Sequence, residues 1–426
     1  MSPGSGLRPD RGFGAQLDDT HPTSSLRGTT LRPGDPSRHE ATPDQLRSKP
    51  SYPIWHDRSG PQVRLGVAAC VVDGDVVSGD VAVEDGVVTD VGLPAGETDL
   101  IAVPGFVDVH FHGHAGFEFA ESTVAEHREM ARKITGTGVT AYQPTLWTMT
   151  VDATVDAIAR HPGIVDGGAR VLGFHLEGPF LSPGKVGAHE PKLLLLPSPE
   201  AAQTYLAAGP VDQITIAPEL DGAPETIAFL SERNVTTSLG HSLATSAETD
   251  RALDAGADAF THVFNAMRSF DHRDPGILGS ALGGERGFVT AIFDGVHFSD
   301  ESARILIRCA GDRLVAITDG TAATGSPSIK VVLGGRECTI VDGAPRHPDG
   351  TIAGSILTMD AALRKLVSLG LPLPEAVRAV STTPARLAGR DDLGRIAVGA
   401  PADLVVLDQG LEVTRTLVSG VEVFRR

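Results

Sequence analysis

Residues 105–112 read GFVDVHFH, an apolar run that ends in two histidines, and this pattern decides the fold. A strand places alternate residues on one face, so His110 and His112 point the same way. Imidazoles and carboxylates at the carboxyl ends of several strands are typical of a site on a (β/α)8 barrel. Four further apolar runs also end on such residues: 171–178 (VLGFHLEG), 235–241 (VTTSLGH), 258–265 (DAFTHVFN) and 314–320 (LVAITDG).

Three more runs bring the strand candidates of the middle region to eight: 140–146 (TAYQPTL), 212–219 (DQITIAPE) and 288–295 (FVTAIFDG). Helical or loop stretches separate them, for example residues 122–138 and 244–257. This alternation favours a parallel barrel over a sandwich. An open doubly wound sheet is the alternative, but it would gather ligands at one switch point instead of drawing them from five strands.

The two ends of the chain have a different pattern. Residues 61–103 and 386–426 contain short Val-rich alternating segments separated by turn signals such as DG and SG. We therefore predict an α/β protein: a TIM-like barrel over residues 104–385, with a small β-sandwich domain built from both ends. Residues 1–60 are rich in Pro, Gly, Ser and charged residues without hydrophobic periodicity, which predicts a disordered N-terminal extension.

The composition limits the classes of function. The chain has 426 residues, 41% of them hydrophobic, and a net charge of −18, which argues against non-specific nucleic-acid binding. No apolar run approaches the roughly 20 residues that a membrane helix needs. The three cysteines form no CxxC pair or even framework, which is typical of reduced thiols in a cytoplasmic protein. The expected partner is a small molecule, with neither nucleic acid nor membrane involved.

Three of the strand-end residues form a set suited to a metal. Glu177 is the last residue before a Gly-Pro break, and His241 and His262 end consecutive strands. Two imidazoles and a carboxylate suit zinc or iron and leave room for water, as a catalytic site requires. Each histidine alone would be uninformative, so the prediction rests on the combination.

The remaining strand-end residues suggest acid–base chemistry and a further metal position. Asp319, in the sequence TDG, can take a proton from an activated water and return it to a leaving group. By itself TDG is as well explained by a strand-terminating turn, and a lone HxH by a polar surface pair. Together with the other strand-end residues, however, they form a set. In that set Asp319 is the expected catalyst, and His110 and His112 are expected metal ligands.

The motifs, taken in order, resemble the amidohydrolase superfamily and, within it, the N-acetylglucosamine-6-phosphate deacetylases. They are PGFVDVHFHGHAG (104–116), HLEGPFL (175–181), GHS (240–242), THVFNAM (261–267), DGVH (294–297) and TDG (318–320). The resemblance extends from about residue 63 to the end. Some superfamily members bridge two metals with a lysine from the fourth strand; the fourth run here has none, and Glu177 on the third takes its place.

The resemblance implies a role for each matching residue. Glu177, His241 and His262 would hold the metal common to the family, and His110 and His112 a second one, giving one or two divalent cations (zinc or iron) per subunit. Asp319 would be the catalytic acid/base. The implied substrate-binding positions are Ala188, His189, Asn265, Ala266, Arg273, Asp294, Gly295, Val296, His297, Ile352, Ala353 and Gly354.

The same resemblance implies a reaction and an assembly. The reaction is hydrolysis of N-acetyl-D-glucosamine 6-phosphate to D-glucosamine 6-phosphate and acetate. Arg273 would bind the phosphate, a bidentate contact that suits guanidinium, and would reach into the neighbouring subunit of a homodimer. Two alternatives stay open: an amidohydrolase for another N-acyl sugar or N-acyl amino acid, and a catalytically inactive relative that serves as a scaffold.

Overall fold

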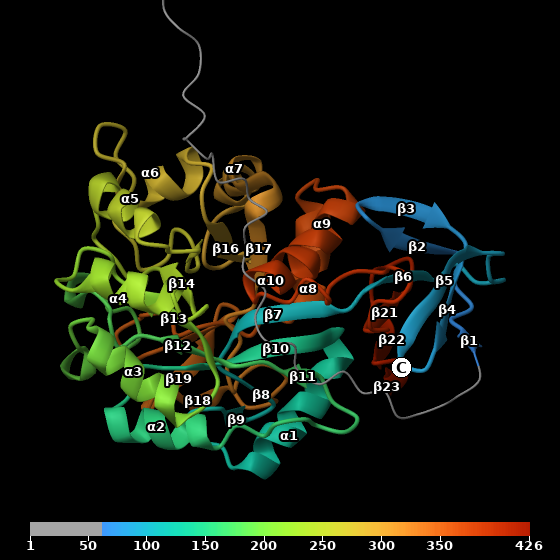
Figure 1. Cartoon of the computed structure of the whole chain (residues 1–426), viewed down its shortest axis with the longest axis horizontal. Helices are drawn as coiled ribbons and strands as arrows, with labels where there is room; N and C mark the ends of the chain where they lie inside the picture. The colour runs from blue at the N-terminus through green and yellow to red at the C-terminus, as the bar shows by residue number, and fades with distance from the viewer. Residues whose placement is uncertain (1–61) are drawn as a thin grey trace, which may run out of the picture. The chain divides into compact units, whose positions relative to one another are not determined.

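The computed structural model describes residues 62–426 and contains the predicted barrel. Its strands pair in parallel in chain order from β7 to β17, and helices surround them (Figure 1). The ring closes where Asp319 N–H donates to His110 O (3.0 Å) and His112 N–H donates to Gly320 O (2.8 Å). The barrel strands, one for each predicted run, are β7 (Phe106–Phe111), β10 (Val139–Leu146), β12 (Phe174–Glu177), β13 (Val211–Ile216), β14 (Thr236–Leu239), β15 (Ala259–Phe260), β16 (Phe288–Ile292) and β17 (Leu314–Ile317).

The predicted (β/α)8 barrel is therefore confirmed, and the open doubly wound sheet is wrong. One run differs in detail, because residues 170–178 form two strands, β11 (Arg170–Val171) and β12. The break includes Gly173, whose N–H donates to Asp212 Oδ2 at 2.9 Å. A Cβ at Gly173 would lie 2.4 Å from Asp212 Cγ, so only glycine allows this close approach.

The helices connect the strands around the outside of the barrel (Figure 1). Two of them begin at a capping box, in which Thr123 pairs with Glu126 and Thr245 with Glu248, satisfying backbone N–H groups at each N-terminus. Among the described residues no helix is long and apolar enough to cross a bilayer. The α-helices are α1 (Val124–Lys133), α2 (Val151–Ala159), α3 (Pro199–Ala208), α4 (Ala223–Ser231), α5 (Ser246–Asp254), α6 (Gly276–Gly283), α7 (Asp300–Ala310), α8 (Met359–Ser368), α9 (Leu373–Val380) and α10 (Thr382–Leu387); short 3-10 turns are Ile134–Thr137, Pro183–Lys185, Pro191–Leu193 and Gly311–Arg313.

Strands from both ends of the described chain share a sheet beside the barrel. Its order is β23 (Val421–Arg425), β22 (Val413–Val418), β21 (Leu404–Leu407), β6 (Ile101–Pro104), β2 (Ala69–Val72) and β3 (Asp75–Ser78). A second sheet contains β1 (Val63–Arg64), β4 (Asp80–Glu84) and β5 (Val87–Leu93). Buried side chains such as Val81 and Leu404 join the two sheets in one apolar cluster. The domain boundaries themselves stay predictions, and the predicted disordered extension (1–60) lies outside the described residues.

Two small sheets in the loops that follow barrel strands were not expected. After β7 comes a hairpin of β8 (Gly113–His114) and β9 (Phe117–Glu118). After β17 comes an antiparallel sheet of β18 (Lys330–Leu333), β19 (Arg336–Val341) and β20 (Ala344–Arg346). Residues 330–346, KVVLGGRECTIVDGAPR, do carry the signals of this sheet, since GG and DG mark its turns.

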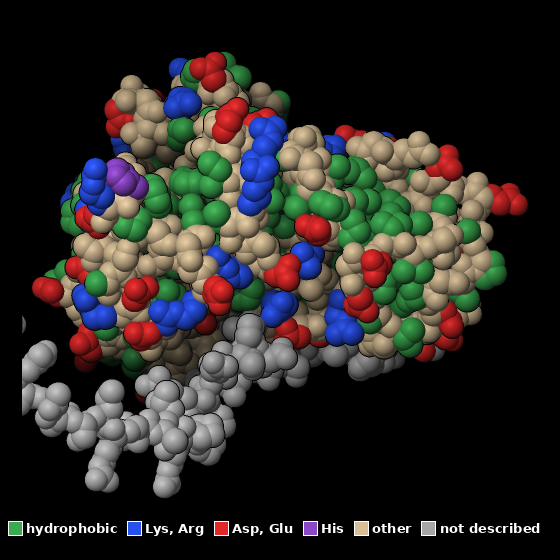
Figure 2. All heavy atoms as spheres, turned by 90° about the horizontal axis from the view of Figure 1, so that it is seen from above, with side chains coloured by type: hydrophobic (Ala, Val, Ile, Leu, Met, Phe, Trp, Pro, Cys, Tyr) green, Lys and Arg blue, Asp and Glu red, His purple; other side chains and the backbone are tan. Residues whose placement is uncertain are grey.

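The surface seen in Figure 2 carries basic and acidic side chains interspersed with apolar ones. On this face neither sign of charge forms one continuous field. Such a mixture makes no broad basic surface on this face.

Candidate active site

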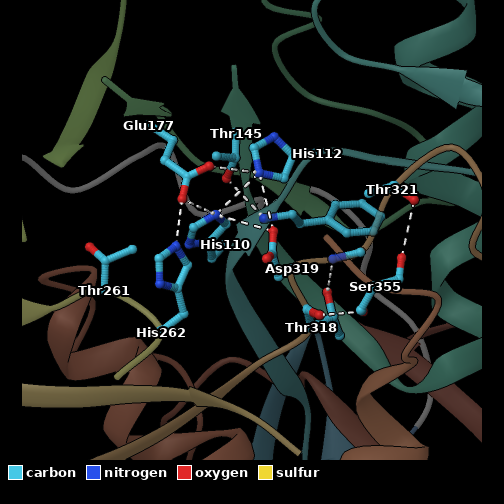
Figure 3. A network of polar contacts seen from close by, with 12 residues as sticks. His110, His112, Thr145, Glu177, Thr261, His262, Thr318, Asp319, Thr321 and Ser355 are labelled. Atoms are coloured by element: carbon cyan, nitrogen blue, oxygen red, sulfur yellow. Dashed lines mark hydrogen bonds and ion pairs between the residues drawn. The ribbon is translucent and has the colours of Figure 1, made fainter. Parts of the chain in front are cut away.

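The predicted strand-end residues meet at one place, at the carboxyl ends of the barrel strands. They come from five strands, and Figure 3 shows most of them pointing toward one another. All are at least 94% buried, because the largest exposed fraction, that of Asp319, is 6%. Their ligand atoms form two groups, each within 4.8 Å: His110, His112 and Asp319; and Glu177, His241 and His262.

Glu177 joins the two groups. Its Oε1 lies 2.8 Å from His262 Nε2 and 3.2 Å from His241 Nε2, and its Oε2 lies 3.2 Å from His112 Nε2. Burial alone would raise the pKa of this carboxyl, but the surrounding imidazoles, His110 foremost, outweigh burial and hold the pKa well below its usual range. Glu177 is therefore an anion that contacts both groups: Oε1 faces His241 and His262 and also lies 3.4 Å from His110 Nε2, and Oε2 faces His112.

His241 shows that its group suits a cation. Its Nδ1–H donates to Lys185 O at 2.9 Å, so Nε2 carries the lone pair. That lone pair points at the carboxylate oxygen of Glu177 and at His262 Nε2, which is only 3.1 Å away. Electron pairs directed at one another repel unless a proton or a metal cation lies among them, and three such atoms converging here can share a metal ion. The fixed tautomer is also the arrangement that metal-ligating histidines usually have.

The second group has a similar geometry. His110 Nε2 and His112 Nε2 lie 3.2 Å apart, and Asp319 Oδ1 lies 3.4 Å from the first and 3.2 Å from the second. Burial opposes ionisation of Asp319, but His110 and His112 nevertheless lower its pKa. Asp319 is thus an ionised carboxylate, able to accept a proton or to bind a cation.

Three of these residues have an unusual backbone conformation. The φ angles of His241, His262 and Asp319 are 48°, 31° and 49°, in the left-handed region that residues with side chains seldom adopt. Such conformations cost roughly 1–3 kcal/mol each and cluster at functional sites. They turn each strand exit sharply, so that the side chain points to the centre of the barrel mouth.

A hydrogen-bond network holds Asp319 in this conformation (Figure 3). Ser355 N–H donates to Asp319 O at 2.7 Å, and Ser355 Oγ–H donates to Thr318 O at 2.6 Å. Gly354 packs directly against the same turn, since a Cβ there would lie 2.7 Å from Asp319 O. The predicted position Gly354 therefore contacts the backbone of Asp319, with its own φ at 60°.

His175, two residues before Glu177 on β12, lies one layer deeper in the barrel. Its ring meets that of His110 edge to face, with centroids 4.6 Å apart, and its Nε2 lies 2.8 Å from Thr215 Oγ1. Burial holds its pKa well below the usual range, so the ring is neutral. His175 supports His110 from below.

Among the predicted substrate positions, His189 reaches the centre of the site. Its Nδ1 accepts the Thr148 N–H at 3.2 Å, which places the ring proton on Nε2, 3.3 Å from Glu177 Oε2. Burial lowers the pKa of His189 to about 4, so the ring is a neutral donor directed into the cluster. Ala188, its neighbour, packs against the small apolar cluster that contains Ala353.

The other predicted positions line the strand exits nearby. Asp294 and His297 follow β16 and bond to each other, His297 Nδ1 to Asp294 Oδ2 at 2.7 Å, and Asp294 also accepts the N–H of Val296 (2.8 Å). Burial raises the pKa of Asp294, but the contact with His297 outweighs it and lowers the pKa. Gly295 completes this turn with a φ of 76°.

Two further predicted segments differ in their surroundings. Asn265 and Ala266 follow His262 directly, and Asn265 Nδ2 donates back to His262 O at 3.2 Å. Ile352 forms an isolated bridge with Arg346, and Ala353 is buried.

Arg273, another predicted substrate-binding position, lies in an exposed loop. Within the described part of the chain its guanidinium makes no ion pair. Among the described residues, no hydrogen bond or ion pair joins the Arg273 side chain to the other predicted site residues.

Two residues at the site were missed in the sequence. Trp147 follows β10, and its ring stacks on His112 with centroids 3.7 Å apart and an interplanar angle of 14°. Glu118 is buried beside it and accepts the Trp147 Nε1–H at 3.2 Å. The position of Trp147 just after a barrel strand was the available signal, whereas no local pattern marks Glu118.

Known proteins resemble this chain over most of its length. The model of the amidohydrolase family matches residues 101–423. N-acetylglucosamine-6-phosphate deacetylase of Homo sapiens is 38% identical, over 76% of this chain and 84% of that protein. N-acetylgalactosamine-6-phosphate deacetylase of Escherichia coli O157:H7 is 35% identical, over 79% of this chain and 93% of that protein.

Solved structures agree with this likeness. One is N-acetyl-D-glucosamine-6-phosphate deacetylase of Mycobacterium smegmatis, a variant in complex with N-acetyl-D-glucosamine-6-phosphate, with a TM-score of 0.80, 35% identity, and coverage of 85% of this chain and 100% of that one. The deacetylase of Thermotoga maritima gives a TM-score of 0.79 at 30% identity, over 85% of this chain and 100% of that one. With the barrel and its buried His/Glu/Asp cluster, these matches place the chain in the amidohydrolase family, among the N-acetylhexosamine-6-phosphate deacetylases.

Proposed function

We propose that this protein hydrolyses N-acetyl-D-glucosamine 6-phosphate to D-glucosamine 6-phosphate and acetate. The observation that carries the proposal is the convergence of Glu177, His241 and His262 with His110, His112 and Asp319 in one buried cluster of a deacetylase-like barrel. An inactive scaffold would have no need of this set. The relatives that act on acetylated hexosamine phosphates support the choice of substrate.

Glu177, His241 and His262 would hold one divalent cation, with zinc or iron as the proposed metals because two imidazoles and a carboxylate suit both. His110 and His112 would hold a second one where two are present, with Asp319 near enough to take part. A bound cation would polarise the amide carbonyl and lower the pKa of a water molecule.

Asp319 is the proposed acid/base. Its carboxylate is ionised and buried, so it can take a proton from the attacking water and then deliver that proton to the departing amine. His189 would assist as a neutral donor, since its Nε2–H points into the cluster and suits a substrate oxygen. Donors that are already oriented stabilise developing negative charge without reorganisation.

The phosphate group would be bound by side chains farther from the cation. His297 is oriented by Asp294, and Arg273 offers the bidentate geometry that phosphate favours. Because Arg273 is exposed and, among the described residues, bonds to none of the other predicted site residues, its proposed role requires a homodimer in which it reaches the partner's site. Asn265, Ala266 and residues 352–354 would border the sugar. We also propose a cytoplasmic location, with Cys70, Cys309 and Cys338 as free thiols.

An assay of amine release tests the proposal. We expect turnover with N-acetylglucosamine 6-phosphate and much less with unphosphorylated N-acetylglucosamine, because the phosphate contacts contribute to binding. N-acetylgalactosamine 6-phosphate should be assayed beside it, since one relative is named for that isomer. If only unphosphorylated N-acyl sugars or N-acyl amino acids are hydrolysed, the proposed substrate is wrong. Light scattering of the same sample tests the homodimer.

A further inference from the structure

Trp147 lies between two parts of the site that are far apart in sequence. One face of its indole stacks on His112, with ring centroids 3.7 Å apart. Next to the indole is Gly334, at the turn of the β18–β19 hairpin, where a Cβ would lie 3.6 Å from Trp147 Cγ. The indole thus fills the space between the first barrel strand exit and the hairpin that follows the last barrel strand.

Glu118 ties these parts together. Its Oε1 accepts the Trp147 Nε1–H at 3.2 Å, and its Oε2 accepts the Gly334 N–H at 3.2 Å. Its own strand, β9, pairs with β8 immediately after His112, and Phe119 N–H donates to His112 O at 3.0 Å. One buried carboxylate therefore bonds to two separate loops while its backbone belongs to a third.

His112 depends on this arrangement more than His241 does. The Nδ1–H of His241 is fixed by Lys185 O, which sets both its tautomer and its ring plane. His112 Nδ1 is buried and has no hydrogen-bond partner among the described residues. Trp147 stacks on the face of the His112 ring and so restricts its plane, in addition to the contacts that His112 Nε2 makes with Glu177 and Asp319.

We propose that Glu118 and Trp147 are positioning residues: together they orient His112 for cation binding and hold the β18–β19 hairpin against the mouth of the site. This inference rests on the proposed metal-dependent function. The hairpin is well placed to affect substrate, because its Leu333 and Cys338 pack in the same cluster as Ala188 and Ala353. Glu118 would act through its contacts and touch neither the cation nor the substrate.

Burial raises the pKa of Glu118 to about 7, so above that pH its ionised carboxylate accepts two N–H groups at once, which suits glutamate to this role. Glu118→Gln keeps the shape of the side chain but leaves only one acceptor oxygen. Its amide NH2 group would then face one of the two N–H donors, that of Trp147 or that of Gly334, and could not accept from it. The matched control is Glu121→Gln, the same chemical change at an exposed position of the same loop. Trp147→Leu removes the stacking surface and gives a second test should Glu118→Gln fail to fold.

The chain's two tryptophans give a direct readout. With Trp55 replaced by Phe, Trp147 is the remaining tryptophan, and its emission under tryptophan-selective excitation reports on the stacked His112 ring. Titration of the metal-free protein with Zn²⁺ should change this emission. In Glu118→Gln we expect the half-maximal change in emission to require about ten- to a hundredfold more Zn²⁺, because disturbing the groups that orient a metal ligand usually weakens metal binding by this factor. The control Glu121→Gln should require the same Zn²⁺ concentration as the parent protein.

Two further measurements complete the test. The amide hydrogen of Gly334 should exchange with deuterium faster in Glu118→Gln than in the parent protein. In Glu121→Gln its exchange rate should equal that of the parent. With the sugar phosphate, kcat should fall more than KM rises in Glu118→Gln and Trp147→Leu. Unchanged Zn²⁺ titration and unchanged Gly334 exchange in Glu118→Gln would overturn the inference. Because neither measurement uses substrate, they remain decisive even if the proposed substrate is wrong.

Discussion

Replacing Glu177 by Gln tests whether this residue joins two cation positions. Glutamine has the same shape but no charge, and the closest contacts of the two Glu177 oxygens are with different groups: Oε1 lies near His262 (2.8 Å) and Oε2 near His112 (3.2 Å). An interaction with a charged group contributes about 1.5–3 kcal/mol. Because the substitution weakens one such interaction at each oxygen, we expect total cation affinity to fall by about 3–6 kcal/mol, or about a hundredfold to ten-thousandfold.

The control is His112→Gln, which disturbs only the group of His110, His112 and Asp319. It should keep tight binding of one cation, held by Glu177, His241 and His262. Competition between the metal-free protein and a chromophoric chelator gives the affinities, and elemental analysis after dialysis gives the number of cations. The assignment fails if Glu177→Gln retains the cation content of the wild type, or if His112→Gln loses as much as Glu177→Gln does.

Three other predictions address the proton donor, the phosphate and pH. Asp319→Asn should keep the cation held by Glu177 but lose about a hundred- to ten-thousandfold in kcat, the usual contribution of an acid/base; equal kcat in stopped assays would argue against the role. Arg273→Ala should lower kcat/KM about ten- to a hundredfold for the phosphorylated sugar and leave the unphosphorylated sugar unaffected; equal losses would make Arg273 structural. Burial lowers the pKa of His127 to about 4 from 6.5, so between these pH values the unfolded chain binds the proton more readily and the free energy of unfolding decreases as pH falls from 6.5 toward 4. His114 and His189 contribute in the same direction, so denaturant melts should show a loss in the wild type that is smaller in His127→Gln by about 3 kcal/mol.

The barrel could be predicted because each of its strands is marked locally. The run before His112 is apolar and ends on polar residues, and the run before Glu177 ends at Gly178 and Pro179, which cannot continue a strand. Such signals depend on a few neighbouring residues. They also determined which side chains reach the strand exits, and hence the buried cluster.

The contacts between loops could not be predicted in the same way. Glu118 binds Gly334, 216 residues later in the chain, and nothing in either segment indicates the other. Trp147 occurs in the sequence as an apolar residue at the end of a strand, which is equally typical of a core position. Its stacking on His112 depends on how the loops after two strands fold over the mouth, a property of the assembled barrel.

The left-handed backbone at His241, His262 and Asp319 has a consequence for engineering the enzyme. Glycine or asparagine adopts this conformation more readily than histidine or aspartate does. Libraries screened only for heat resistance should therefore enrich glycine or asparagine at these three positions and drift toward inert barrels. A screen that demands turnover alongside heat resistance would retain the histidines and the aspartate, and stabilising changes would then be found elsewhere in the chain.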